Sequence, residues 1–406
     1  TYTLIRADQL SAGSIDQSLL GSVPFLYNSS LRSDATAGTV TATLALKTAT
    51  ELGLPSTTAG AYLPLIQNIG NDPGLEGALL AQTTRSGLIS LYNQLLPNYS
   101  GSVFNIAAAS IAAFSRPIDD RRDPVGGGFW VQQTNLGIFA DGTTDEPGYK
   151  GWSIGAVGGY EIPHSQLGIL GVTLGGSANQ LYPDEAADAE DLHSTLMDAG
   201  IYWRTSYGGF SANVRLGGDY MKVTSKRVIA VLGGDGLAVL RTADGSWSSF
   251  GFNAHGMVSY EKRFGRYYLR PQASFDYITL KEDGYTETGG GDGMDLAVKS
   301  RTSSRLAAFA GVAVGATYGP DKSWGPEVLV GYKGVAAETL GDTTARFAAG
   351  GDTFVLHADE LSGQGVAARV SLKGENGSGA FAVEAGAESR DSLAIYDLRL
   401  AGHVQF

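Results

Sequence analysis

The sequence predicts an all-β membrane protein, an antiparallel transmembrane β-barrel of about twelve strands with an α-helix that traverses its pore. It also predicts an N-terminal segment of short strands and helices that precedes the pore helix. Runs of roughly ten residues with alternating apolar and polar side chains follow one another from Phe129 onward. The connections between these runs alternate between short and long. No stretch approaches the ~18 apolar residues of a transmembrane helix, which leaves a closed barrel as the way to span a bilayer.

The composition favours strands and turns and argues against several classes of site. The 406 residues include 57 glycines, and aromatic residues make up 10% of the chain. The net charge of −12 argues against a nucleic-acid partner. Cysteine is absent, which excludes disulfides, thiol catalysis and cysteine metal sites. No secretory signal precedes Thr1, so we expect a mature chain or an excised fragment.

The chain before the barrel divides into two parts by pattern. In residues 1–48, TYTLIRADQL and SVPFLYNSSLRS have the pattern of short strands, and the Thr- and Val-rich run TVTATLALK follows them. Within residues 49–98, the run GLEGALLAQTTRSGLISLYNQLL has helical spacing and ends at Pro97. We therefore expect strands first and a helical region second.

A slim helix is predicted over residues 99–116, with Ser100 as its N-cap and Pro117 as its stop. Eighteen or so residues span roughly 27 Å, close to the hydrocarbon thickness of a bilayer. A barrel of about twelve strands should leave a lumen that accepts one helix, although an ordinary surface helix is the alternative interpretation. The residues that we assign to this pore helix are Ser100, Val103, Asn105, Ala108, Ala109, Ala112 and Phe114.

Each alternating run of the barrel assigns one face to lipid and the other to the lumen. In FSANVRLGGDY, for example, Phe210, Val214 and Leu216 alternate with Arg215 and Asp219. Lumen charges are expected to hydrate the pore and to pair across strands, and the alternative is that some of them hold the helix. The predicted lumen charges are Arg215, Asp219, Glu261, Arg270, Asp276, Asp397 and Arg399.

The connections predict which rim faces outside. Residues 225–246, 282–300 and 337–362 form long polar connections, whereas tight turns such as Gly208-Gly209 lie between them. Outer-membrane barrels have long outer loops and short periplasmic turns. This parity places the first and last strands on the same rim, so that they can pair and close the barrel. The charged run 119–123 would then emerge into periplasmic water.

The last eleven residues, YDLRLAGHVQF, form a strand with one apolar face that we expect to contact lipid. That face carries Tyr396, Leu398, Leu400, Val404 and Phe406.

The chain resembles the C-terminal part of a classical autotransporter (type V secretion) of Gram-negative bacteria. The likeness lies in the terminal YDLRLAGHVQF, in LRPQASFDYITLKEDGYTETGG with its L-x-P-x-A-x-x-x-Y pattern, in GFW at the start of the barrel, and in YTLIRADQL followed by SVPFLYNSSLRS. The last two segments are similar to the final rungs of a passenger β-helix. The resemblance implies a translocator that helps its own N-terminal passenger across the outer membrane and anchors it at the cell surface, with the helix in the pore.

The resemblance also implies a domain order and a set of partners. Residues 1–48 would end the passenger, 49–98 would be an extracellular helical linker, 99–128 the pore helix and periplasmic hinge, and 129–406 the barrel. The partners would be outer-membrane lipid, the passenger, and the barrel-assembly machinery and periplasmic chaperones during biogenesis. The machinery would recognise Tyr396, Leu398, Leu400, Val404 and Phe406. We expect a monomer in the bacterial outer membrane with its N-terminal part on the cell surface.

No catalytic residue, cofactor or metal site is predicted. Residues 151–155 match G-x-S-x-G, but they lie in an alternating strand rather than in the strand–turn–helix context of a nucleophile. Residues 290–295 match G-G-x-G-x-D only once, whereas that calcium site needs stacked repeats. Some relatives cleave the passenger inside the pore, and Asn105 is the residue of the right type, but we expect no self-cleavage.

Two other hypotheses stay open at this point. One is an outer-membrane porin or channel whose N-terminal segment is a plug. The other is an outer-membrane hydrolase.

Overall fold

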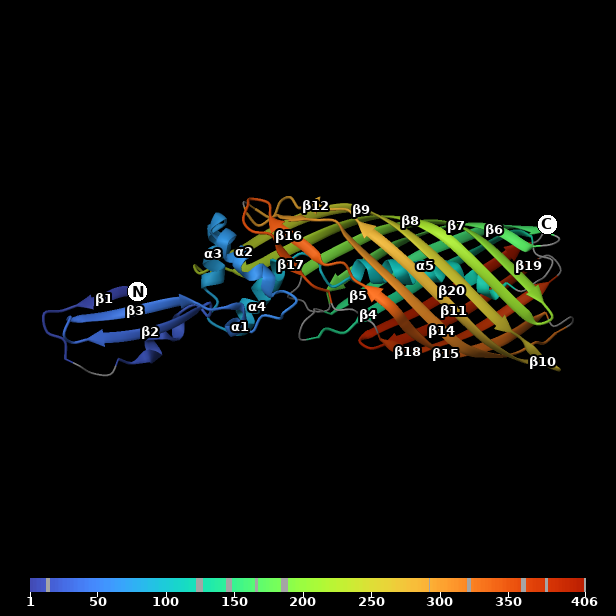
Figure 1. Ribbon diagram of the computed structural model, residues 1–406, viewed down its shortest axis with the longest axis horizontal. Helices are drawn as coiled ribbons and strands as arrows, with labels where there is room; N and C mark the ends of the chain where they lie inside the picture. Colours follow the sequence, from blue (N-terminus) through green and yellow to red (C-terminus); the bar gives the residue numbers. More distant parts are fainter. Residues whose placement is uncertain are drawn as a thin grey trace.

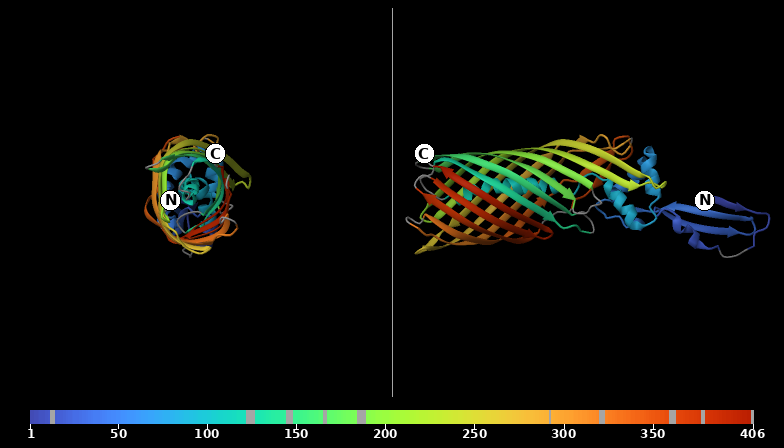
Figure 2. Two further views of the ribbon diagram at one scale, coloured as in Figure 1. Left: turned by 90° about the vertical axis from the view of Figure 1, so that its right-hand side faces the viewer. Right: turned by 180° about the vertical axis from the view of Figure 1, so that it is seen from behind.

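The computed structural model describes residues 1–404 except 12–14, 122–126, 144–147, 165–166, 184–188, 292, 320–322, 359–362 and 377–378. The chain forms an elongated molecule, with a small N-terminal sheet, a group of short helices and a barrel along one axis (Figure 1). An α-helix lies inside the barrel, which Figure 2 shows from its end. None of the helices in the described part of the chain is both long and apolar enough to cross a membrane.

The barrel is a closed antiparallel sheet of twelve strands, as the alternation of the sequence predicts. A short additional strand, β10 (Lys262–Phe264), pairs with β11. Closure comes from β20 and β4, where Val404 lies opposite Phe129, which confirms the predicted pairing of the first and last strands. The strands are β4 (Gly128–Ala140), β5 (Tyr149–His164), β6 (Gly168–Pro183), β7 (Ala189–Tyr207), β8 (Phe210–Leu232), β9 (Ala238–Tyr260), β11 (Tyr267–Glu282), β14 (Arg301–Ala316), β15 (Trp324–Thr339), β18 (Gln364–Asn376), β19 (Gly379–Arg390) and β20 (Leu393–Val404).

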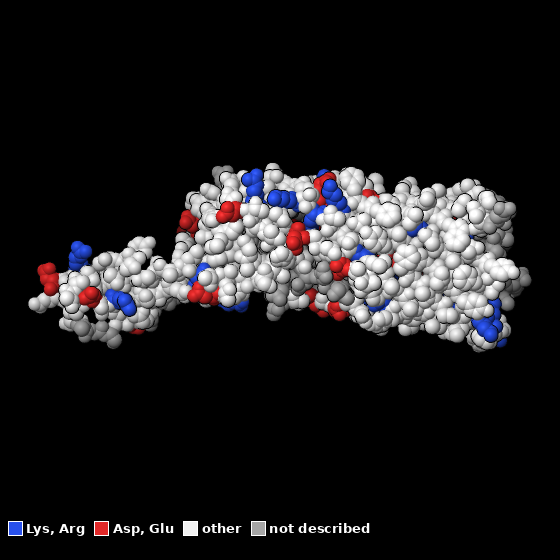
Figure 3. Space-filling view, in the orientation of Figure 1, with Lys and Arg blue, Asp and Glu red and all other residues white. Residues whose placement is uncertain are grey.

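The outer face of the barrel is apolar. Apolar side chains at alternate positions, such as Ile154, Leu174 and Val330, are more than half exposed. In a soluble protein such side chains are usually buried in the core. Over the half of the barrel far from the short helices, the visible surface carries few charged side chains apart from a group of Lys and Arg at the far rim (Figure 3). A continuous exposed apolar band of this kind suits contact with lipid acyl chains.

The long connections are more structured than expected. The segment 225–246 was predicted as a loop, but β8 and β9 continue through it as a hairpin with only residues 233–237 between them. The connections 282–300 and 337–362 also contain strands, and these form a second antiparallel sheet, which we call the loop sheet. It consists of β12 (Tyr285–Thr286), β13 (Leu296–Val298), β16 (Thr343–Phe347) and β17 (Phe354–Leu356).

Short helices lie between the N-terminal sheet and the barrel (Figure 1). Polar N-caps start three of them, because Thr48, Asp72 and Thr84 each accept a backbone N–H from the first turn. We call α1 to α4 the linker helices. The elements are α1 (Ala49–Leu52), η2 (Ala59–Ala61), α2 (Tyr62–Asn68), η3 (Ile69–Asn71), α3 (Pro73–Leu80) and α4 (Arg85–Gln94).

The N-terminal strands do not stack as β-helix rungs. Both β1 (Tyr2–Arg6) and β2 (Tyr27–Asp34) pair antiparallel with β3 (Thr39–Leu46), with η1 (Gln17–Ser22) between the first two. Rungs of a parallel β-helix would pair in parallel, so the β-helix-like interpretation of residues 1–48 is corrected. The tight turn between β2 and β3, with Gly38 at φ +62°, produces a hairpin instead.

The helix inside the barrel is α5 (Ser102–Asp120), and its bounds differ from the prediction of 99–116. Its N-cap is Gly101, not Ser100, and Pro117 lies within the helix rather than ending it. The second difference has its physical reason in the barrel wall, where Gln132 of β4 contacts the helix.

Candidate functional site

The apolar face of α5 packs against one side of the lumen. Val103, Phe104, Ile111, Phe114 and Ile118 are at most 4% exposed and belong to one hydrophobic cluster. The wall contributes large apolar side chains that point inward from β4 to β9 and β11, among them Trp130, Val157, Leu196, Met221, Val223, Trp247, Ile278 and Leu280. Burial of this face fixes the side of the barrel on which the helix lies.

The other face of α5 is small or polar. Ala108, Ala109 and Ala112 are half-buried and line a cavity of ≈ 50 Å³ between the helix and the wall. On the packed side, Ser110 shares a hydrogen bond of 3.2 Å with Ser153 and approaches Asn179 at 3.4 Å. The small side chains let the helix lie close to the strands.

Asn105 holds the first half of the helix to the wall. Its amide Nδ2 donates to the Tyr149 hydroxyl at 2.7 Å, and its Oδ1 accepts from the Arg305 guanidinium. Arg305 in turn pairs with Glu338. Asn105 is 1% exposed, so both polar atoms of its amide are satisfied by the barrel.

Ionic contacts hold the second half. Arg116 donates to Asp397 of the last strand at 2.9 Å. Asp119 accepts from His255 Nε2 at 2.9 Å, while Nδ1 of the same ring lies 2.8 Å from Asp276. His255 therefore joins the helix carboxylate of Asp119 to Asp276 of the wall, with one ring nitrogen against each.

The end of the helix is clamped rather than solvated. Arg121 donates two hydrogen bonds, of 3.0 and 2.7 Å, to the Glu161 carboxylate, which is 1% exposed and also accepts from Arg204 and Tyr202. Asp120 accepts from Lys373 at 2.7 Å. Residues 119–121 of the charged run that was expected to emerge into water are only partly exposed, because the wall supplies partners of opposite charge. Arg122 and Asp123 lie outside the described residues.

Pro117 stays inside α5 because the barrel replaces the hydrogen bond that it cannot make. A proline lacks the N–H that would bond the carbonyl four residues earlier, here that of Ala113. The Gln132 amide of β4 donates to this carbonyl at 3.2 Å, and Gln132 is 2% exposed. The wall therefore satisfies the carbonyl that the helix leaves unpaired.

The predicted lumen charges fall into two groups. Asp397 contacts the helix directly, and Asp276 supports it through His255. The others pair within the wall: Arg215 with Asp198, Thr173 and Asn253; Asp219 with Asn253; Glu261 with Arg270 and Arg263; Arg270 also with Glu327; and Arg399 with Glu384 and Asp397.

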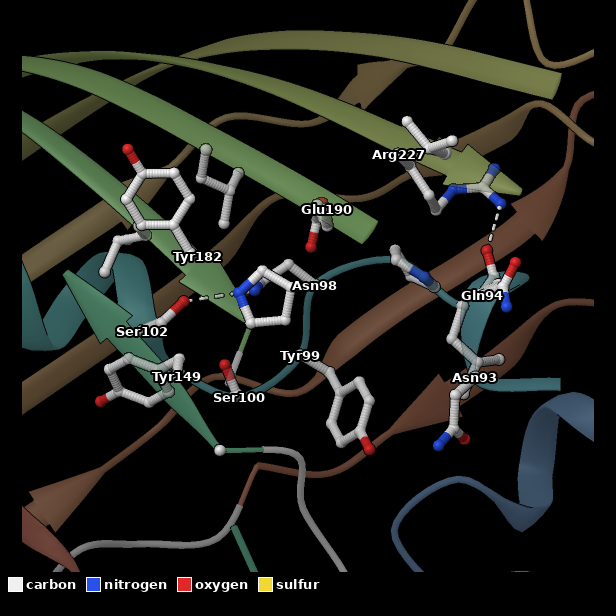
Figure 4. A pocket seen from close by; sticks show the side chains of 17 residues that line it. Asn93, Gln94, Asn98, Tyr99, Ser100, Ser102, Tyr149, Tyr182, Glu190 and Arg227 are labelled. Atoms are coloured by element: carbon white, nitrogen blue, oxygen red, sulfur yellow. Dashed lines mark hydrogen bonds between the residues drawn. The ribbon is translucent and has the colours of Figure 1, made fainter. Parts of the chain in front are cut away.

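The mouth of the lumen holds the segment that leads into α5. Arg227 donates to the Gln94 carbonyl at 3.1 Å, and Arg301 donates to the Asn98 carbonyl at 3.3 Å. The Asn98 amide donates to Ser102 Oγ at 3.2 Å (Figure 4). A pocket of ≈ 70 Å³ lies at this mouth, and Asn98, Ser100 and Ser102 are among the residues that line it. Ser100 is 5% exposed and lies before the helix rather than capping it.

The terminal strand presents the predicted residues outward. Tyr396, Leu398 and Leu400 are 55%, 47% and 45% exposed on the outer face. Val404 lies at the end of β20, opposite Phe129. Phe406 lies outside the described residues.

Residues of the two motifs that were considered as catalytic or calcium sites make structural contacts instead. Ser153 of the G-x-S-x-G match lies in β5, and its hydroxyl contacts Ser110. Asp295 of the G-G-x-G-x-D match accepts from the Gly290 amide at 2.7 Å and so stabilises its own loop. Across the ranges that the structure describes, no three His, Asp or Glu side chains gather to hold a metal ion.

Sequence reasoning missed most of the wall residues that hold α5, namely Gln132, Tyr149, Glu161, His255, Arg305 and Lys373. The period of two places side chains such as His255 and Gln132 on the lumen face. It carries no information about which of them reaches the helix.

Comparison with known proteins places the fold. The sequence model of the autotransporter β-domain matches residues 129–388. Among solved structures, the chain is similar to the translocator domain of the autotransporter NalP from Neisseria meningitidis, with 13% identity, a TM-score of 0.58, and coverage of 76% of this chain and 99% of that one. It is also similar to the transport unit of the autotransporter AIDA-I from Escherichia coli, with 10% identity, a TM-score of 0.51, and coverage of 74% and 97%. No curated protein sequence matches this chain.

Proposed function

This chain belongs to the autotransporters, whose β-barrel lies in the outer membrane and exports its own passenger to the cell surface, and we propose that α5 is the plug that seals its pore once export is complete. The observation that carries the proposal is the set of contacts along the whole helix. The wall satisfies Asn105, Arg116, Asp119, Asp120 and Arg121. A helix still in transit would have no such residue-specific partners.

We propose that the domains follow the division expected from the sequence. Residues 1–48 end the passenger, 49–98 form the extracellular linker, 99–128 the plug and hinge, and 129–406 the translocator. The outward row Tyr396, Leu398 and Leu400, together with Val404 and Phe406 of the same sequence pattern, would be the assembly signal that the barrel-assembly machinery reads. Periplasmic chaperones would deliver the chain, and the barrel would act as a monomer in lipid.

We assign no catalytic residue, cofactor or metal to the chain. The family is a secretion domain rather than a catalytic one. We also expect the chain to remain intact. An N–H of the Asn105 amide donates to the Tyr149 hydroxyl and its Oδ1 accepts from Arg305, so both polar ends of this side chain are engaged by the wall.

The orientation is tested by surface display. An epitope tag placed before Thr1 should bind antibody on intact Gram-negative cells without permeabilisation. A tag that binds only after the outer membrane is opened would contradict the proposal, and would favour a channel whose N-terminal segment stays inside. A barrel-sized fragment on a denaturing gel, instead of the intact chain, would contradict the absence of self-cleavage.

A further inference from the structure

One hydrophobic core joins the linker helices to the barrel. The linker contributes side chains such as Leu52, Leu65 and Leu79, each at most 2% exposed. The barrel side contributes Ile229 of β8, Met294 just before β13, and six residues of the loop sheet, each at most 8% exposed: Leu296, Val298, Ala345, Phe347, Phe354 and Leu356. The apolar residues of the linker therefore share one buried cluster with residues that lie 130 or more positions later in the sequence.

Neither half of this core has enough local structure to stand alone. The linker helices have 4, 7, 8 and 10 residues, and isolated helices shorter than about 12 residues are marginal in water. The strands of the loop sheet have 2, 3, 5 and 3 residues, shorter than most strands in globular proteins. Each half thus needs the apolar surface of the other.

Polar contacts also join the linker helices to the barrel loops at defined positions. Arg241 of the β8–β9 hairpin donates to both oxygens of Asp72, at 2.9 and 3.1 Å, and Asp72 is the N-cap of α3. The His357 amide donates to the Thr57 carbonyl at 3.0 Å. Gly60 allows a close approach, because a Cβ built there would lie 2.8 Å from the Val355 carbonyl oxygen.

The shared core continues directly into the plug. Leu95 and Leu96 belong to it, and α5 starts at Ser102. On either side of Leu95 and Leu96, Arg227 and Arg301 bind the carbonyls of Gln94 and Asn98. The shared core and the plug are therefore adjacent along the chain, and wall side chains hold the segment that joins them.

We propose that residues 49–96 are a locking segment that folds only against the barrel's own loop sheet and β8–β9 hairpin, and that this coupled folding locks α5 in the pore. The proposal rests on the proposed function, because the lock forms only after residues 49–96 have left the pore. Its binding partner is within the same chain, and the recognition surface is the buried face of β13, β16 and β17.

Hydrogen exchange of the purified, detergent-solubilised full chain tests the coupling with matched pairs of variants. On β17, Leu356 is fully buried in the core, whereas its neighbour Val355 is 36% exposed. We expect Leu356→Ser to accelerate amide exchange in α2 to α4 by roughly thirtyfold or more. Val355→Ser should leave that exchange within roughly twofold of wild type.

The reverse pair lies on α2, outside the barrel sequence. Leu65→Ser, at a 2% exposed position, should accelerate exchange in β16 and β17, and Leu63→Ser, at a 59% exposed position, should not. If Leu356→Ser or Leu65→Ser affects only its own half, the linker folds independently and the proposal is overturned. Display of the tag at Thr1 on cells is a separate readout. Failed display of the wild-type chain refutes the proposed function, whereas normal display with uncoupled exchange refutes only the lock.

Discussion

The side-chain amide of Gln132 donates to the Ala113 carbonyl. Within α5 this carbonyl would accept from the N–H of residue 117, which is a proline and has none. Replacing Gln132 with Leu should leave this buried carbonyl unpaired and destabilise the seated helix by about 1–3 kcal/mol. Faster amide exchange within α5 measures the loss. In a Pro117→Ala background the helix supplies its own N–H, so the same substitution should cost less. An equal cost in both backgrounds would show that Gln132 acts through packing alone.

Glu161 accepts from Arg121 of the plug and from the buried Arg204 of the wall, so one carboxylate holds two cations. Glu161→Gln should destabilise this region by about 3–5 kcal/mol, because it leaves a guanidinium uncompensated. The denaturant midpoint of the detergent-solubilised chain measures this. Glu375→Gln, at an exposed position of β18, is the control and should leave the midpoint unchanged. Equal midpoints for the two variants would refute the assigned role.

Asp397 joins the last strand to Arg116 of the helix. Asp397→Asn should weaken this contact and let α5 fluctuate, so that brief conducting events in planar bilayers become at least several times more frequent. Asp391→Asn, in the exposed turn before β20, should behave like wild type. If the two variants gate alike, the Arg116 contact does not contribute to the seal.

The capping box of α1 predicts a pH dependence that is confined to the linker. The Thr48 backbone N–H, with the Thr48 hydroxyl and the Asn28 amide, lowers the pKa of Glu51 below its usual value of 4.5. A pKa that is lower in the folded state stabilises the helix above the unfolded pKa, and this contribution is lost as the pH falls through the folded pKa.

Exchange of the α1 amides should therefore accelerate as the pH is lowered below about 4.5, beyond the intrinsic pH dependence of exchange. Glu51→Gln should remove this additional acceleration. A variant that retains it would show that another carboxylate is responsible.

Much of the barrel could be predicted because one rule governs it. Successive side chains of a strand point to opposite faces, so Leu398 lies on the outer face and Asp397 on the lumen face. This assignment needs no knowledge of tertiary neighbours. The position of α5 also followed from its length and its small side chains.

The remaining features depend on contacts between distant residues. A helix stop at Pro117 is the correct local expectation, and Gln132 overrides it from another element. The strands β16 and β17 are too short to have a clear periodic signal, and their buried side chains pack against linker helices from a distant part of the chain. The expectation that Arg121 is solvated failed because Glu161 is inside the lumen, at a site that only the closed barrel creates.

The central claim is that a helix of the chain itself fills the bore of a lipid-embedded barrel, and single-channel conductance in planar bilayers tests it most directly. The chain of residues 1–406 should show low, irregular conductance, and the barrel alone, residues 128–406, should conduct steadily at a much higher level. Equal and steady conductance from both would contradict the claim, because α5 would then not obstruct the pore.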